Sequence, residues 1–115
     1  MLKCSFADPM IGLVIERDET IVGAVVLNNY TPNCNIDLSA VGKGVWTPTI
    51  VRSVFRYCFQ RVKRVTAVTR VDNSTAIKSL TKIGFKQEGI LRDYFPEGDA
   101  VCLALLKREQ KVVRV

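Results

Sequence analysis

The feature that most restricts the fold is a helical stripe of apolar residues set between two strand-like segments. The stripe occupies positions i, i+3, i+4, i+7, i+8 and i+11 of segment 51–62, namely Val51, Val54, Phe55, Cys58, Phe59 and Val62. This period predicts an amphipathic helix with one buried face. Thr47 can cap the helix, and Pro48 suits its first turn because a proline there leaves no N–H unpaired.

The two flanking segments have the patterns of strands. In segment 35–41 the apolar residues Ile36, Leu38 and Ala40 alternate with Asp37 and Ser39, which predicts a half-buried strand. Segment 65–71 is rich in β-branched residues and predicts a second strand. A strand, a helix and a strand in succession imply a right-handed crossover and at least one parallel pair of strands.

The remaining segments extend this core on both sides. Residues 12–16 and 21–28 predict an antiparallel hairpin with a polar turn at 17–20, and residues 29–35 predict a loop. Asp72 or Asn73 caps a second helix, which Gly84 ends and whose apolar face consists of Ala76, Ile77, Leu80 and Ile83. Residues 85–91 and 100–106 predict two further strands. The fold class is α/β (α+β) in the order β-β-β-α-β-α-β-β, and at 115 residues we expect a single domain, 1–115.

The cysteines and the absence of histidine narrow the chemistry. Cys4, Cys34, Cys58 and Cys102 form no CxxC pair, and the sequence contains no His. We therefore expect no metal site and no histidine base, and we interpret the cysteines as free thiols. The longest apolar run, residues 21–27, is too short to cross a bilayer, and the first ten residues lack a secretory signal. The expected location is cytoplasmic.

Positive charge is concentrated on one segment. The net charge of the chain is +6, and segment 61–86 carries seven Lys or Arg against one acid, Asp72. This segment accounts for the whole excess, which indicates either an anionic partner near it or a solvated helix face. Nucleic acid is the weaker choice of partner, because no exposed aromatics interleave the charges and no motif that reads RNA or DNA is present.

A glycine-flanked turn precedes the first predicted helix. Gly42 and Gly44 allow a ligand to approach the backbone closely, and Lys43 supplies a charge. Exposed N–H groups and the positive end of a helix dipole favour a phosphate at such a turn. The turn is equally compatible with a plain loop, since the Walker and dinucleotide-binding spacings are absent.

The second predicted helix and the strand after it carry a resemblance to a known family. Residues 71–93, VDNSTAIKSLTKIGFKQEGILRD, closely resemble the second signature of the GNAT superfamily of acyl-CoA N-acyltransferases, in which an Asn opens the helix and Gly-Phe closes it. The continuation EGILRD resembles the branch that acetylates the N-terminal amines of ribosomal proteins. The segments NNYTP and YFPEGD are similar to compact members encoded by bacteriophages, and the whole resemblance spans residues 12–107.

The resemblance implies a splayed sheet that holds acyl-CoA between strands 35–41 and 65–71. Acetyl-CoA is the expected co-substrate. The first of these strands would pair with the pantetheine arm, and the glycine-flanked turn would hold the pyrophosphate. Asn73 would lie beside the pantetheine near the thioester, and the basic helix 73–83 would face the nucleotide end. The residues that the resemblance assigns to the cofactor are Leu38, Ala40, Val41, Gly42, Lys43, Gly44, Val45, Trp46, Thr47, Asn73 and Ala76.

The implied reaction is the direct attack of a primary amine, on a protein or a small molecule, on the thioester. Asp37 is the candidate base on the predicted strand, and Tyr94 is the candidate proton donor. A solvated strand residue and an ordinary packed aromatic are the alternative interpretations of these two side chains.

Three departures from the family pattern leave a second function open. Trp46 stands where the family usually has a small residue, Leu80 stands where many members place a tyrosine acid, and the usual N-terminal helices are not expected. The alternative is a catalytically degenerate GNAT-fold protein, encoded by a phage, that binds a host protein. We also expect a homodimer, in which the second subunit completes the acceptor side, and no membrane partner.

Overall fold

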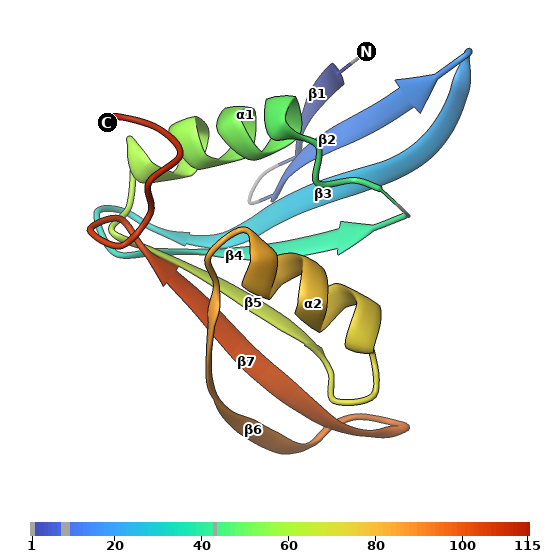
Figure 1. Ribbon diagram of the computed structural model, residues 1–115, viewed down its shortest axis with the longest axis vertical. Coiled ribbons are helices and arrows are strands. Elements are labelled where there is room, and N and C mark those ends of the chain that lie inside the picture. Colours follow the sequence, from blue (N-terminus) through green and yellow to red (C-terminus); the bar gives the residue numbers. More distant parts are fainter. Residues whose placement is uncertain (1, 8–9, 43) are drawn as a thin grey trace.

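Seven strands and two helices make up the computed structural model, which describes residues 2–7, 10–42 and 44–115 (Figure 1). In chain order the elements are β1 (Leu2–Ala7), β2 (Met10–Arg17), β3 (Thr20–Thr31), β4 (Asn35–Val41), α1 (Pro48–Phe59), β5 (Arg64–Arg70), α2 (Ser74–Lys82), β6 (Lys86–Phe95) and β7 (Gly98–Leu106). Both helices lie on one face of the sheet, and in the described part of the chain the opposite face carries no helix (Figure 1). The helices and the face that they cover share one apolar core.

The sheet has the strand order β1-β2-β3-β4-β5-β7-β6. β4 and β5 pair in parallel, and the other neighbours pair antiparallel. The predicted α/β (α+β) class and the predicted element order from β2 onward are therefore confirmed. β1 precedes these elements and pairs with β2 from Leu2↔Ile15 to Ala7↔Met10.

Strand structure extends beyond the predicted limits in two places. The first strand begins at residue 2 and not near residue 12, although the alternation of apolar and polar types in LKCSFA was a signal that could have identified it. β3 continues to Thr31, so residues 29–31 are strand and not loop. The register shifts between Asn28 and Thr31, and Asn29 has a φ of 49°. Asn tolerates this left-handed backbone, which lets the strand continue past an irregularity.

Both helices begin where the sequence predicts a cap. Thr47 Oγ1 accepts the N–H of Ile50 at 3.4 Å, and Pro48 is the first residue of α1. Asn73 Oδ1 accepts the N–H of Ala76 at 3.2 Å at the start of α2. These contacts satisfy N–H groups that have no partner inside a helix.

α1 supplies most of the helical part of the core. Its buried residues are Ile50, Val51, Val54, Phe55, Cys58 and Phe59. Phe55 lies 5.7 Å from Phe59, in an edge-on arrangement, and 6.5 Å from Phe85, measured between ring centroids. α2 adds Leu80 as its buried residue. None of the described helices has both the length and the apolar character needed to span a bilayer.

The parallel strands separate halfway along their length. β4 and β5 are paired from Asn35↔Arg64 to Leu38↔Ala67 and no further. β4 then continues to Val41 with β3 as its partner, and β5 continues to Arg70 with β7 as its partner. The predicted splay of the sheet between these two strands is therefore confirmed.

Candidate functional site

A groove of about 1140 Å³ opens where β4 and β5 separate. Its walls come from the diverging ends of the two strands, the turn after β4, the first turns of α1 and one side of α2. The lining residues are Leu38, Ser39, Ala40, Val41, Gly42, Gly44, Val45, Trp46, Pro48, Val51, Arg52, Ala67, Val68, Thr69, Asn73, Thr75, Ala76, Ser79, Leu80, Lys82, Ile83 and Val112.

Most of the residues predicted for the cofactor lie together on this groove. The predicted residues that line it are Leu38, Ala40, Val41, Gly42, Gly44, Val45, Trp46, Asn73 and Ala76. Thr47 does not line the groove, but it caps the helix that begins there. Lys43 lies outside the described residues. Segments 38–46 and 73–76, which are far apart in the sequence, thus meet at one surface.

The two glycines of the turn have different roles. A Cβ on Gly42, whose φ is 101°, would lie 2.3 Å from the carbonyl oxygen of Val22 and 2.7 Å from the Cα of Gly23. No side chain fits there, so this glycine lets the turn pack against β3. Gly44 has a φ of 67°, and a Cβ on it would meet nothing within 4 Å. Gly44 therefore presents open backbone to the groove.

The end of the groove at α1 has the properties of an anion site. α1 begins there, so its first N–H groups and the positive end of its dipole lie at the turn. Arg52 on α1 and Lys82 on α2 line the same groove and are exposed. Neither cation forms an ion pair with any residue that the structure describes. Two uncompensated charges and a helix N-terminus favour a ligand with phosphate groups.

Several groove residues were not predicted from the sequence. Thr75, Ser79 and Lys82 follow one another at helical spacing on the same side of α2, so the period of the helix was a signal that could have identified them. Arg52 follows the buried Val51 on α1. Val112 gave no such signal, because it belongs to a tail that folds back onto the core through Val113.

Two of the three departures from the family pattern, Trp46 and Leu80, lie on the groove. Trp46 is half-buried and packs against the core, so its indole forms part of the wall. Leu80 is only 6% exposed and also lines the groove. An aliphatic side chain at this position cannot donate a proton, so a proton donor for a leaving thiolate must come from elsewhere.

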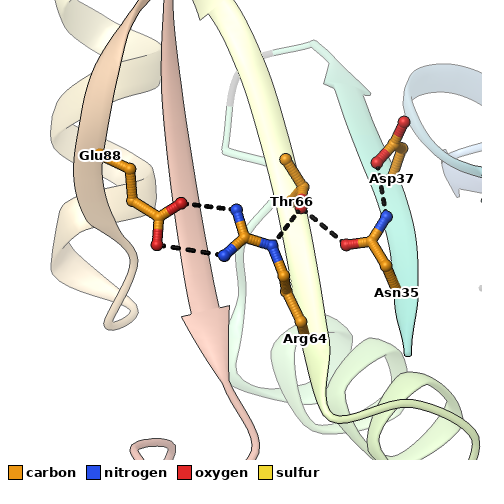
Figure 2. Close-up of polar contacts among 5 residues, drawn as sticks. All are labelled: Asn35, Asp37, Arg64, Thr66 and Glu88. Atoms are coloured by element: carbon orange, nitrogen blue, oxygen red, sulfur yellow. Dashed lines mark hydrogen bonds and ion pairs between the residues drawn. The ribbon is translucent and has the colours of Figure 1, made fainter. Parts of the chain in front are cut away.

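Asp37 lies on the face of the sheet that the helices do not cover (Figure 2). The amide of Asn29 donates to one carboxylate oxygen at 2.8 Å, and the amide of Asn35 donates to the other at 2.9 Å. Residues that are two apart on a strand share a face, so Ser39 lies beyond Asp37 on this same face. Ser39 lines the groove, so the groove comes within about 7 Å of Asp37 along β4.

An ion pair between β5 and β6 lies on the same open face as Asp37. Arg64 on β5 and Glu88 on β6 form two hydrogen bonds, of 2.5 and 3.1 Å (Figure 2). The guanidinium holds the pKa of the Glu88 carboxyl below its usual value, and the hydrogen bond to Glu88 raises the pKa of Arg64. Both side chains are about one-third or more exposed, so the pair is a surface feature of the open face.

Tyr94 is not brought to the groove. It is 56% exposed on β6 and packs edge-on against Phe95, with 5.0 Å between ring centroids. Phe95 pairs with Gly98 on β7, whereas Thr66, which pairs with Asp37, has its β7 partner six residues further on, at Ala104. Six residues of strand span about 20 Å. The role of Tyr94 as a proton donor stays a prediction.

The comparisons with known proteins agree with this architecture. No protein-family model and no curated protein matches the sequence. Among solved structures, a probable acetyltransferase is 24% identical with a TM-score of 0.77, and the match covers 87% of this chain and 62% of that chain. The spermidine N-acetyltransferase from Vibrio cholerae, in complex with CoA and spermine, is 18% identical with a TM-score of 0.74, covering 87% and 67%. The ribosomal-protein-alanine N-acetyltransferase from Brucella melitensis is 19% identical with a TM-score of 0.69, covering 86% and 70%.

The chain has the fold of the GNAT acetyltransferases. A Bacillus anthracis structure of similar fold, with a TM-score of 0.69 and 18% identity, is an acetyltransferase of the GNAT family by its description. This chain spans 62–70% of the length of these four solved structures. The fold places the groove at the separation of β4 and β5.

Proposed function

We propose that the protein is an acetyl-CoA-dependent N-acetyltransferase that acts on a primary amine of a protein or a small molecule. The observation that carries this proposal is the groove at the separation of β4 and β5, which joins a free strand edge to a helix N-terminus. A pantetheine arm needs hydrogen-bond partners along its length, and a pyrophosphate needs N–H groups and positive charge. The groove offers both in one continuous surface.

The residues on the groove fit the parts of acetyl-CoA in order. Beyond Leu38, none of the described residues pairs with β4 on its β5 side, so Ser39, Ala40 and Val41 offer an open backbone edge to the pantetheine. The turn at Gly44, together with the start of α1, is suited to the pyrophosphate. Arg52 and Lys82 are the cations available to the remaining phosphate charge.

The chemistry asks three things of the protein. It must hold the amine beside the thioester, accept a proton from the amine, and supply a proton to the sulfur as the C–S bond breaks and the amide bond forms. Asp37 is the proposed acceptor because its carboxylate lies on the open face, two residues before Ser39, which lines the groove. Tyr94 stays a predicted donor on its residue type alone; because it lies off the groove, water is the proposed source of this proton.

The acceptor class is proposed from two sources. The names of two matched structures specify spermidine and a ribosomal-protein alanine, and both molecules present a primary amine. The sequence resemblance to the ribosomal-protein branch and to compact bacteriophage-encoded members favours a protein N-terminus. The homodimer and the cytoplasmic location also stay proposals, and sedimentation tests the first of them.

A catalytically inactive binding protein is the second candidate. Leu80, aliphatic and nearly buried in the groove wall, favours it because it lacks the hydroxyl that a tyrosine acid would provide. Such a protein would form a stable complex with another protein and transfer no acetyl group.

Calorimetry with acetyl-CoA, followed by mass spectrometry of acceptors, tests both candidates. The acceptors are spermidine and a peptide with N-terminal alanine. We expect saturable binding of acetyl-CoA and an acetylated product that increases with protein concentration. No binding at millimolar acetyl-CoA would overturn the enzyme proposal, and binding without any product would favour the second candidate.

A further inference from the structure

A chain of hydrogen bonds crosses the open face from β6 to β4 (Figure 2). Glu88 pairs with Arg64, and Arg64 Nε donates to Thr66 Oγ1 at 2.9 Å. Thr66 Oγ1 donates to Asn35 Oδ1 at 2.7 Å, and Asn35 Nδ2 donates to Asp37 Oδ1 at 2.9 Å. Every donor between Arg64 and Asp37 therefore points toward the Asp37 carboxylate.

The direction of this chain follows from the chemistry of its first member. A guanidinium can only donate, so the Thr66 oxygen must accept and its own proton is left for Asn35. The amide oxygen of Asn35 is then occupied, which turns its NH₂ group toward Asp37. Hydrogen bonds that share one direction polarise and strengthen one another. The cation at Arg64 and the acceptor-only carboxylate of Asp37 therefore favour the same orientation of the Asn35 amide.

The other oxygen of Asp37 is held from β3. Asn29 reaches it at 2.8 Å, and the left-handed backbone of Asn29, with a φ of 49°, lies at the irregularity of this strand. Each carboxylate oxygen thus accepts one fixed N–H and keeps a second lone pair. Neither oxygen forms an ion pair with a cation of the described chain.

The chain of hydrogen bonds ends at Asp37, beside the groove. Asp37 and Thr66 are paired in the sheet, one row before the last parallel pair, Leu38↔Ala67. Ser39 and Val68, two residues further along the same strands, line the groove. Asp37 and Thr66 therefore lie one row before the point where the two strands separate and the groove opens.

We infer that Thr66 and Arg64, with Glu88 as the anchor of Arg64, are positioning residues of the acetyl transfer. They orient Asn35, which together with Asn29 sets the carboxylate of Asp37 at the mouth of the groove. The carboxylate then accepts the proton that the amine loses as its nitrogen bonds to the acetyl carbon. This inference rests on the proposed function, because it assigns work to residues that touch neither the amine nor the thioester.

A pair of substitutions at Thr66 tests the inference. Thr66→Val keeps the shape of the side chain but removes the hydroxyl that links Arg64 to Asn35, and Thr66→Ser keeps the hydroxyl. With spermidine and acetyl-CoA as substrates, we expect kcat to fall about tenfold or more in Thr66→Val. The KM for acetyl-CoA should change less than twofold, and Thr66→Ser should stay within twofold of the unsubstituted protein in both parameters.

Side-chain amide signals give a readout that needs no turnover. In ¹⁵N-labelled protein, the NH₂ signals of Asn35 should shift in Thr66→Val and stay in place in Thr66→Ser. Glu88→Gln, which weakens the anchor of Arg64, should move the same signals in the direction seen for Thr66→Val. Unchanged NH₂ signals of Asn35 in Thr66→Val would show that Thr66 does not link Arg64 to Asn35 by hydrogen bonds, which would overturn the inference.

The kinetic outcomes separate this inference from the proposed function. A kcat for Thr66→Val equal to that of the unsubstituted protein would overturn the inference while the acetyltransferase proposal stands. If the unsubstituted protein binds acetyl-CoA but acetylates neither spermidine nor the alanine peptide, the proposed function fails, and the positioning role fails with it. An equal loss of kcat in Thr66→Ser would also contradict it, because the hydroxyl would then not be the group that matters.

Discussion

Leu38 and Ala67 form the last pair of the parallel strands β4 and β5. Beyond this pair β4 stays bonded to β3, through Ala24↔Val41, and β5 stays bonded to β7, through Arg70↔Ala100. The strands therefore part without losing their outer partners. The backbone edges of β4 and β5 that face the gap are stable because each strand stays paired on its other side. The groove is therefore a consequence of strand pairing.

Gly44 offers a test of the anion site that leaves folding intact. Asn and Asp both tolerate the left-handed backbone that Gly44 adopts, with a φ of 67°, and a Cβ there meets nothing within 4 Å. We expect Gly44→Asp to weaken acetyl-CoA binding at least tenfold, or about 1.4 kcal/mol, because its carboxylate would face phosphate. Gly44→Asn has the same shape without the charge and should bind far better than Gly44→Asp in calorimetry. Equal affinities would show that no phosphate lies at this turn.

Asn73 combines a helix cap with a place on the groove. Its side chain accepts the N–H of Ala76 at 3.2 Å, so Asn73→Ala should lower the free energy of unfolding by about 1 kcal/mol. Asn73→Asp retains an oxygen for the cap and should unfold like the unsubstituted protein. If the amide also contacts the cofactor, as its position predicts, Asn73→Asp should bind acetyl-CoA more weakly. If Asn73→Asp binds acetyl-CoA with unchanged affinity, Asn73 acts only as a helix cap.

The parts of the site that can be predicted from the sequence are those formed by residues close to one another in the sequence. The alternation in segment 35–41, the turn around Gly44 and the cap at Asn73 each act within a few residues, and all three meet at the groove. The chain of hydrogen bonds from Glu88 to Asp37 could not be predicted in this way. Its contacts join residues 24 and 31 positions apart in the sequence, and they exist only because strand register places them in adjacent rows.

The position of the predicted proton donor could not be predicted from its residue type. The prediction of Tyr94 rests on the ability of a phenol to donate a proton, but residue type says nothing about distance. The bend of β6 and the register of its pairing with β7 place Tyr94 near the hairpin end and off the groove. β1 is a different case, since the alternation in LKCSFA is a local signal of a strand, whereas its pairing with β2 is a contact that the alternation alone does not specify.

The cysteines should differ sharply in reactivity. Burial raises the pKa of the Cys58 thiol to about 12, which leaves roughly one thiol in 10⁴ ionised at pH 8. Cys34 is exposed. Iodoacetamide at pH 8 should alkylate Cys34 in the folded protein, and should reach Cys58 only after guanidinium chloride is added, as measured by peptide mass spectrometry. Rapid alkylation of Cys58 without denaturant would mean that α1 leaves the core far more often than its burial indicates.

The tail after β7 should contribute to cofactor binding through one residue. Gln110 Oε1 accepts the N–H groups of Val112 and Val113 at 2.9 and 3.0 Å, and Gln110 Nε2 donates to the carbonyl of Val113 at 2.7 Å. With Val113 only 8% exposed and packed into the core, this clip holds Val112 on the groove wall.

Val115 provides the matched control for Val112. The two side chains are similarly exposed, at 44% and 41%, but only Val112 lines the groove. We expect Val112→Asp to weaken acetyl-CoA binding several-fold, because a carboxylate then shares the groove with the phosphates, and added salt should reduce the loss by screening the repulsion. Val115→Asp should bind like the unsubstituted protein, and both variants should keep its melting temperature, since neither side chain belongs to the core. Equal affinities for the two variants would place the cofactor away from the tail.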